Sequence, residues 1–286
     1  MTKGAIYQAE IPAKINLSLA VTGRRDGLHT LDMIVCPCYK FVDVVKFFPT
    51  EKGGIEINCK ASFPSFCPER FENFVKSKIQ AVADKFGVCG IVEIEKDIPL
   101  GAGLGGSTAC IVGAIKTMRE YALALGKSVS LDDGFLLSLG SDVPCMLNGG
   151  TCRVQGVGEI VTPLENDENL DFEIVVADGG ADSGACYKMY DELQKEHGES
   201  QTETIVPQTV KEALTALRND LFEASCKMNP NIRIAYDNLK AKGFDKVVMT
   251  GSGSAVVGIL NKSRHCGNGI ACKQATPRAA LGLLFC

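Results

Sequence analysis

The glycine-rich segment at residues 99–108 constrains the fold of this chain more than any other part of the sequence. It reads PLGAGLGGST, with four glycines inside six residues, and a stretch with helical spacing, residues 107–125, follows it. Glycines let the backbone turn with its amide groups directed inward, and the start of a helix adds unpaired N–H groups and a positive end. The segment therefore predicts a loop that holds phosphate groups. The alternative is a tight strand-to-helix turn with Ser107 as a simple N-cap.

The spacing of these glycines disfavours the better-known phosphate-binding motifs. A Walker A loop would need a glycine where Tyr121 stands, although residues 126–128 supply its Gly-Lys-Ser ending. The loop does match G-x-G-x-x-G, but charged residues and a proline precede it where a dinucleotide-binding motif has an apolar strand. The H-R-D motif of protein kinases is absent at the required spacing. The segment therefore predicts a phosphate-binding loop of another type.

Two short motifs elsewhere carry polar side chains suited to catalysis. In PAKINL, residues 12–17, Lys14 and Asn16 fall on the same face of an expected strand, where they can meet a carboxylate, a phosphate or a hydroxyl. In GSDVP, residues 140–144, Asp142 lies on a turn, where its carboxylate can accept a proton from a substrate hydroxyl while paired with a lysine. Taken alone, the first motif also fits an amphipathic edge strand and the second an N-cap or Asx turn.

Two further loops could contact a ligand. TGSGS, residues 250–254, lies between two apolar stretches and fits either a hairpin turn or a second loop that closes over a phosphate. TGRRDGLH, residues 22–29, holds His29, which is one of three histidines in the chain. A lone histidine is more often structural than catalytic, but a loop rich in arginine and glycine suits the recognition of a polar ligand.

Composition excludes several classes of protein. Apolar residues make up 45% of the 286 residues and the formal net charge is −4, so neither a disordered chain nor a nucleic-acid partner is expected. The start of the chain has no signal-peptide pattern, and no apolar stretch is long enough to span a membrane. The 13 cysteines have no repeating spacing, which favours reduced thiols in a cytoplasmic protein, and no residue is assigned as a metal ligand.

Hydrophobic patterning predicts a mixed order of strands and helices. Strands are expected at residues 11–21, 42–48, 54–59, 90–95, 151–153, 160–164, 172–177, 246–249 and 255–260. Helices are expected at residues 71–86, 107–125, 185–197 and 210–228. The irregular alternation favours an α+β fold over a regular βαβ arrangement, with a boundary near residues 150–160.

Together, these motifs resemble the GHMP kinase superfamily. The resemblance rests on stretches that occur in the order of the family and span most of the chain: PAKINLSLAVTGRRDGLHTLD (12–32), IPLGAGLGGSTA (98–109), GSDVPCMLNGG (140–150), GVGE (156–159), RNDL (218–221) and MTGSGSAVVG (249–258). The first stretch resembles the corresponding segment of the GHMP kinases that phosphorylate the 2-hydroxyl of a cytidine diphosphate-linked methylerythritol in non-mevalonate isoprenoid biosynthesis.

The resemblance implies a two-domain α+β fold with the active site in the cleft between the domains. Residues 1–155 would form an N-terminal domain like domain 2 of ribosomal protein S5, with the glycine-rich loop, and residues 156–286 a ferredoxin-like C-terminal domain. It also implies ATP as phosphate donor with Mg²⁺, a small-molecule substrate, no nucleic acid or membrane partner, and a monomer or homodimer.

The resemblance assigns roles residue by residue. Lys14 and Asp142 would be the catalytic pair, and Asn16, Leu28 and His29 would contact the substrate, with His29 at the cytosine edge. Leu28 stands where the family has a tyrosine that stacks on cytosine, which leaves an apolar contact only. The ATP-binding residues would be Gly101, Gly103, Gly105, Gly106, Ser107 and Thr108 at the phosphates, with Lys96 and Asn73 near the adenine.

Two alternatives stay open. Loss of the stacking tyrosine at Leu28 favours another GHMP kinase that acts on a different small alcohol, such as mevalonate or homoserine, whereas the segment GRRDGLH argues against it. The other alternative is a catalytically weak nucleotide-binding homologue, against which the presence of both Lys14 and Asp142 argues. Cys110 and Cys145 stand inside the motifs where the family usually has other residues.

Overall fold

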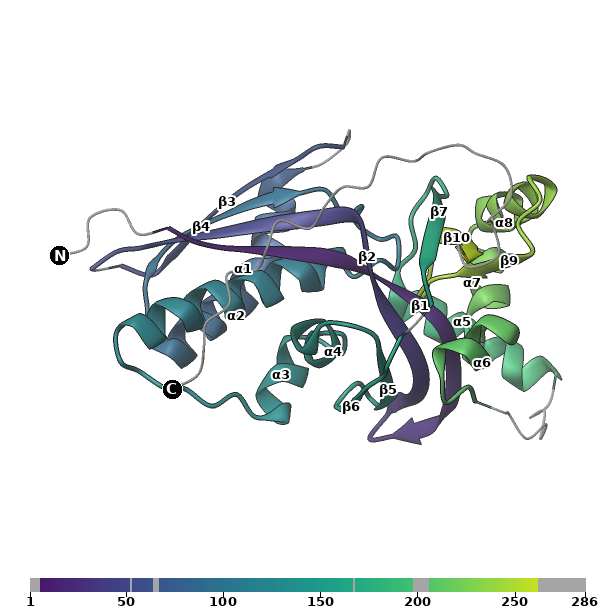
Figure 1. The fold of residues 1–286 in the computed structure, drawn as a ribbon, viewed down its shortest axis with the longest axis horizontal. Coiled ribbons are helices and arrows are strands. Elements are labelled where there is room, and N and C mark those ends of the chain that lie inside the picture. Colours follow the sequence, from purple (N-terminus) through teal and green to yellow (C-terminus); the bar gives the residue numbers. More distant parts are fainter. Residues whose placement is uncertain (1–5, 52, 64–66, 167, 198–205, 262–286) are drawn as a thin grey trace.

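The computed structural model describes residues 6–51, 53–63, 67–166, 168–197 and 206–261. Within them the chain forms two β-sheets with helices packed against both (Figure 1). The expected α+β class is therefore confirmed. No helix in these ranges is long and apolar enough to cross a membrane.

The first sheet is built around a long antiparallel pair of strands, β1 and β2. Its strand order is β3-β4-β2-β1-β8, while β5 pairs with β2 and β6 pairs with β5. The pair turns at Asp26 and Gly27, which both have positive φ, as a tight hairpin requires. The strands are β1 (Tyr7–Arg25), β2 (Leu28–Pro49), β3 (Ile55–Ala61), β4 (Gly90–Lys96), β5 (Cys152–Gly156), β6 (Ile160–Pro163) and β8 (Arg218–Asn219).

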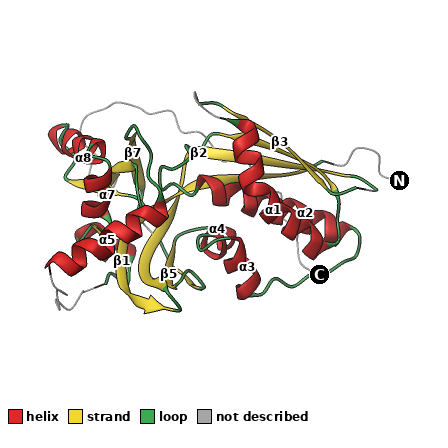
Figure 2. Cartoon of the chain, turned by 180° about the vertical axis from the view of Figure 1, so that it is seen from behind, coloured by secondary structure: helices red, strands yellow, loops and turns green. Residues whose placement is uncertain are grey.

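Two long helices, α1 (Pro68–Phe86) and α2 (Gly106–Ala124), cover one face of this sheet (Figure 2). Close packing explains why glycine is needed inside α2, because a Cβ on Gly113 would lie 2.4 Å from the side chain of Val45. Two short helices, α3 (Asp133–Leu139) and α4 (Val143–Asn148), follow α2 in the chain. Helix α4 begins directly after Asp142, so the fold places that carboxylate at the N-terminus of a helix.

The second sheet has three antiparallel strands in the order β7-β10-β9. Its strands are β7 (Leu170–Val176), β9 (Lys246–Met249) and β10 (Ala255–Asn261), and the helices near it are α5 (Ser183–His197), α6 (Val210–Thr215), α7 (Phe222–Met228) and α8 (Asn231–Ala241). The glycine-rich loop joins this part to the first sheet, since the carbonyl oxygen of Gly101 accepts hydrogen bonds from the amides of Ala181 and Ser254.

The predicted helix at 210–228 is wrong, because it is two helices separated by a strand. Arg218 and Asn219 pair with β1 beside Ser18 and Leu19, and the Asp220 carboxylate accepts a hydrogen bond from the amide of Val21. Pairing with a distant strand overrides the local helical pattern there.

Other elements extend or add to the prediction. Strand β2 starts at Leu28 rather than at residue 42, and α3, α4 and α8 had not been predicted. The boundary between residues 155 and 156 stays a prediction; strands β6 and β8 come after it in the chain yet belong to the first sheet. The stretch 262–286 lies outside the described residues.

Candidate active site

A cavity of about 350 Å³ brings most of the predicted motifs together. Two larger cavities in the described part of the chain, of about 520 and 590 Å³, are lined by none of the predicted site residues. The motif residues that line the smaller cavity are Lys14, Gly101, Gly103, Gly105, Gly106, Ser107, Thr108, Asp142, Gly251 and Ser252. The cavity thus combines a phosphate-binding loop with an ionic pair.

The glycine-rich loop adopts a conformation that favours glycine. Gly101, Gly103 and Gly105 have φ of 67°, 77° and 78°, in the left-handed region. The N-cap of α2 is Gly105, with no side-chain hydrogen bond to the helix, so the expected alternative of Ser107 as N-cap is not what forms. The first-turn amides of α2 are therefore available to an anion, which the positive end of the helix also attracts.

Gly103 gives the most direct test of this loop. A Cβ at residue 103 would lie 2.2 Å from the Thr250 carbonyl oxygen. We expect Gly103→Ala to weaken ATP binding by about 10-fold or more, since strain of this kind costs about 1–3 kcal/mol. Calorimetric titration of ATP measures it. Gly126→Ala is the matched control, because Gly126 has φ of 73° but nothing within 4 Å of an added Cβ. Equal loss in both variants would contradict a specific role for the loop.

Lys14 and Asp142 form an ion pair at the cavity wall. The Lys14 Nζ lies 3.5 Å from Asp142 Oδ2, although the two residues come from β1 and from the start of α4. The Lys14 side chain is nearly buried, with 8% exposed, whereas 32% of the Asp142 side chain is exposed. The lysine is therefore fixed, and the carboxylate is the partner that a substrate can reach.

Asn16 fixes Lys14 rather than facing the cavity. Its Oδ1 accepts hydrogen bonds from Lys14 Nζ at 2.7 Å and from the Gly251 amide at 3.1 Å. Thr250 Oγ1 in turn accepts a hydrogen bond from the backbone amide of Asn16 at 3.0 Å. The TGSGS segment is therefore attached to β1, and Asn16 acts on the site by positioning the lysine.

Neither His29 nor Leu28 lines the cavity. The His29 ring stacks on Tyr187, with centroids 4.7 Å apart, and its Nε2 lies 2.8 Å from Asp191 Oδ1. Leu28 is 60% exposed at the hairpin tip. Tyr187, which the sequence did not single out, lines the cavity, and burial raises the pKa of its phenol, which therefore stays protonated.

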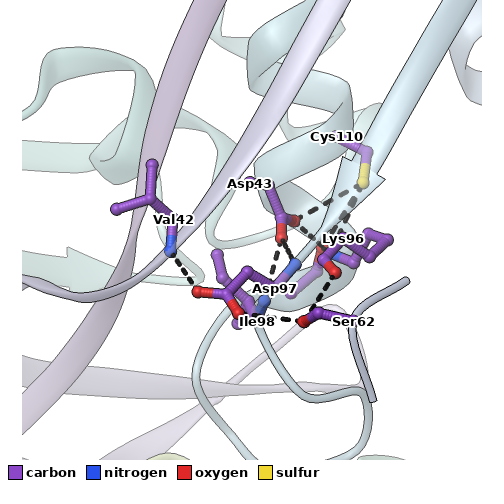
Figure 3. Close-up of polar contacts among 8 residues, drawn as sticks. Val42, Asp43, Ser62, Lys96, Asp97, Ile98 and Cys110 are labelled. Atoms are coloured by element: carbon purple, nitrogen blue, oxygen red, sulfur yellow. Dashed lines mark hydrogen bonds and ion pairs between the residues drawn. The ribbon is translucent and has the colours of Figure 1, made fainter. Parts of the chain in front are cut away.

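Lys96 does not line the cavity, and its place near the adenine stays a prediction. Its side chain is fully buried and pairs with Asp43, while its Nζ donates to the Gly106 carbonyl oxygen (Figure 3). Asp43 Oδ1 also accepts hydrogen bonds from the amides of Asp97 and Ile98, both at 2.9 Å. Lys96 therefore stabilises the end of the glycine-rich loop from the protein interior.

Cys110 completes this buried cluster. Its Sγ lies 3.5 Å from the Lys96 Nζ, and Figure 3 shows it above the Asp43 carboxylate. Burial raises the pKa of the Cys110 thiol to about 12, so this cysteine is a neutral thiol in the cluster.

Asn73 is exposed on α1 and does not line the cavity, so the structure does not place it at a nucleotide. Its neighbour Phe74 does line the cavity, together with Lys78, one turn further along the helix. Phe74 is 57% exposed. An aromatic face and a cation are thus present where only Asn73 had been expected.

The comparisons with known proteins identify the family. Residues 73–150 match the family model described as the GHMP kinases N terminal domain. A relative from Desulfitobacterium hafniense (strain Y51), a 4-diphosphocytidyl-2-C-methyl-D-erythritol kinase, is 33% identical over 87% of this chain and 85% of its own length. The chain belongs to this kinase family. A second kinase of the family, from Bacillus pumilus (strain SAFR-032), is 29% identical over 87% of this chain and 86% of its own length.

Solved structures agree with this family. A crystal structure of 4-(cytidine 5'-diphospho)-2C-methyl-D-erythritol kinase has a TM-score of 0.64 at 25% identity, covering 88% of this chain and 89% of that one. The mevalonate kinase of Methanococcus jannaschii has a TM-score of 0.58 at 16% identity over 91% and 92% of the two chains, which shows the shared fold alone. The expected α+β GHMP kinase fold is confirmed.

Proposed function

We propose that this chain transfers the γ-phosphoryl group of ATP to the 2-hydroxyl of 4-diphosphocytidyl-2-C-methyl-D-erythritol, in non-mevalonate isoprenoid biosynthesis. Relatives named as kinases of this substrate match most of the chain. The observation that carries the proposal is that the Lys14–Asp142 ion pair lies on the same cavity as the glycine-rich loop. A kinase needs a phosphate-binding loop and an acceptor-activating group within one site.

The loop is assigned to the phosphates of ATP. The backbone amides of Gly105 and Gly106 and the hydroxyls of Ser107 and Thr108 supply hydrogen-bond donors at the positive end of α2. A nucleotide bound there lies with its terminal phosphate toward Lys14, since Gly105 is close enough to Lys14 for an added Cβ to lie 3.0 Å from its Cγ.

The ion pair is assigned to the acceptor. Asp142 accepts a hydrogen bond from the substrate hydroxyl, orients its oxygen toward the γ-phosphorus and takes up the proton as the new bond forms. Lys14 remains charged and offsets the negative charge that develops on the transferred group. The terminal P–O bond of ATP breaks, and ADP leaves.

GHMP kinases use ATP, generally with a divalent metal, and the residues present fit Mg²⁺. Ser107 lines the cavity at the start of α2, and Mg²⁺ in such sites is held by a loop hydroxyl or carboxylate together with substrate phosphates. When bound, the ion neutralises phosphate charge. Among the described residues no group of three or more histidine, cysteine or acidic side chains forms a separate metal site.

Recognition of cytosine is assigned to the β1–β2 hairpin and α5. Asp191 occupies the Nε2 of His29, which leaves Nδ1 as the ring nitrogen that can meet the edge of a base. The exposed Leu28 and the ring of Tyr187 offer apolar contact nearby. We place adenine toward the other end of the cavity, beside Phe74 on α1.

We also infer that the enzyme works in the cytoplasm. All ten cysteines in the described residues are free thiols, which suits a reducing compartment.

A coupled assay of ADP release tests the substrate. We expect the cytidine-linked alcohol to give a kcat/KM at least about 100-fold above that for mevalonate or homoserine, because buried polar groups that recognise cytosine lose their partners with the other alcohols. Faster turnover of mevalonate or homoserine would favour the alternative that this chain is a GHMP kinase for a different small alcohol. ATP binding by calorimetry without turnover of any alcohol would indicate a nucleotide-binding protein instead.

A further inference from the structure

Two buried cysteines face each other next to the candidate catalytic pair. The Sγ atoms of Cys145 and Cys152 lie 3.3 Å apart and share a hydrogen bond in which either can be the donor. Cys145 is in the first turn of α4, three residues after Asp142, and Cys152 is the first residue of β5. Both are free thiols, and neither phosphoryl transfer nor nucleotide binding has a use for them.

The segment between these cysteines can adjust to a shorter distance. A disulfide bond is about 2.05 Å long, so the sulfurs must approach by roughly 1.2 Å. The connecting turn contains Gly149 and Gly150, with φ of 71° and 69°, and an added Cβ at either would meet nothing within 4 Å. The turn therefore has space and conformational freedom to accommodate the approach.

A small oxidant can reach one of the two sulfurs. Cys145 lines a second cavity of about 160 Å³, which Lys14 and Cys36 also line. Cys145 is 5% exposed and Cys152 is fully buried, so an oxidant that enters this cavity meets Cys145 and not Cys152. This arrangement suits oxidation of Cys145 followed by attack from Cys152.

The hydrogen bond between the sulfurs favours the reactive thiolate form of the pair. Donation from Cys145 lowers the pKa of the Cys152 thiol against the effect of burial, and the same hydrogen bond together with burial raises the pKa of the Cys145 thiol. Cys152 is therefore the sulfur that carries the charge in the resting pair. Since a thiolate and not a thiol is the nucleophile, the pair is more reactive than two isolated buried thiols. Cys145 can pass its proton to Cys152 along this hydrogen bond as it reacts, which leaves the charge on the sulfur of the residue that lines the cavity.

We propose that Cys145 and Cys152 are a modification site at which hydrogen peroxide forms a reversible disulfide, and that this disulfide slows phosphoryl transfer by displacing Asp142. The effect on activity rests on the proposed function, whereas the formation of the disulfide does not.

The chemistry balances with peroxide as the oxidant. The thiolate of Cys145 attacks one peroxide oxygen, the O–O bond breaks, and the leaving hydroxide takes a proton to become water. Cys152 then attacks the sulfenic sulfur of Cys145, the S–O bond breaks, and a second water leaves. Two thiols are oxidised to one disulfide, and one peroxide is reduced to two waters.

Helix α4 transmits the change to the catalytic pair. The Met146 amide donates to the Asp142 carbonyl oxygen at 3.0 Å, and the Gly149 amide donates to the Cys145 carbonyl oxygen at 3.1 Å, so α4 moves as one body. Displacement of Cys145 therefore carries Asp142 away from Lys14. A shift of about 1 Å in a reacting group can cost about 100-fold in rate.

Peptide mapping and kinetics on the full chain test the proposal. Both cysteines fall in one tryptic peptide, residues 128–153, which has no internal lysine or arginine. After peroxide treatment and its removal by catalase, we expect this peptide to lose the mass of two hydrogens. We expect kcat to fall by about 10- to 100-fold with the KM for ATP nearly unchanged. Dithiothreitol should restore kcat and the original mass of the peptide.

Two variants make the test specific. Cys152→Ser should keep the activity of the reduced enzyme and resist peroxide. Cys186→Ser, which removes another buried free thiol, should remain sensitive. A disulfide that joins Cys36 instead, or full activity in the disulfide form, would overturn the proposal. A reduced enzyme that phosphorylates no alcohol would overturn the proposed function, while the mass of the peptide would still decide on the disulfide.

Discussion

Replacing Asp142 by asparagine is expected to lower kcat by about 10²–10⁴-fold, the usual contribution of a positioned general base. Asparagine has nearly the same size and can still contact the substrate hydroxyl, but it neither takes up the proton nor balances the Lys14 ammonium 3.5 Å away. ATP affinity should change little, because the glycine-rich loop and the start of α2 hold the phosphates. Pre-steady-state kinetics with calorimetric titration of ATP separates the two quantities.

Asp133→Asn is the matched control for this variant. It makes the same chemical change at an exposed carboxylate in the first turn of α3, outside the cavity. Its kcat should equal that of the unmodified enzyme. Unchanged kcat in Asp142→Asn, or a loss of ATP affinity as large as the loss of kcat, would show that Asp142 does not act on the acceptor.

Replacing Asp43 by alanine is expected to reduce the free energy of unfolding by about 3–5 kcal/mol, as removal of one partner from a buried ion pair does. The Lys96 ammonium would be left fully buried without its counter-charge, and the amides of Asp97 and Ile98 would lose their acceptor. Urea unfolding followed by circular dichroism measures the change. Lys96 also holds the Gly106 carbonyl oxygen, so ATP affinity should fall as well.

Two further variants separate the buried charge from a general weakening of the sheet. Glu95→Ala breaks two partly exposed ion pairs on the same sheet, with Lys46 and Lys60, and should cost far less. In the double variant Asp43→Ala with Lys96→Met, part of the lost stability should return, because no unpaired charge remains buried. Equal losses in Asp43→Ala and Glu95→Ala would refute the account of this cluster.

The parts of the site that local sequence chemistry determines could be predicted. The glycine-rich loop was identified because its backbone conformation favours glycine, and the helix after it follows from apolar spacing. Lys14 and Asp142 could each be singled out, but their pairing came only with the family resemblance, since nothing in their local sequences shows that β1 and α4 meet.

Residues that act through distant contacts could not be placed from the sequence. Asp43 lies in the middle of β2 without any motif, so its partnership with Lys96 was invisible, and Lys96 was assigned to the nucleotide. Tyr187 and Phe74 sit on helices where their aromatic rings fit a buried stripe equally well. Only the packing of those helices shows that both rings face the cavity.

The most direct test of the central claim is phosphorus NMR of the product formed from ATP and 4-diphosphocytidyl-2-C-methyl-D-erythritol. The account predicts one new phosphomonoester on the 2-hydroxyl, formed in equal amount to ADP and lost in Asp142→Asn. ADP without a new phosphoester, or a phosphoester that still forms at the full rate in Asp142→Asn, would contradict it.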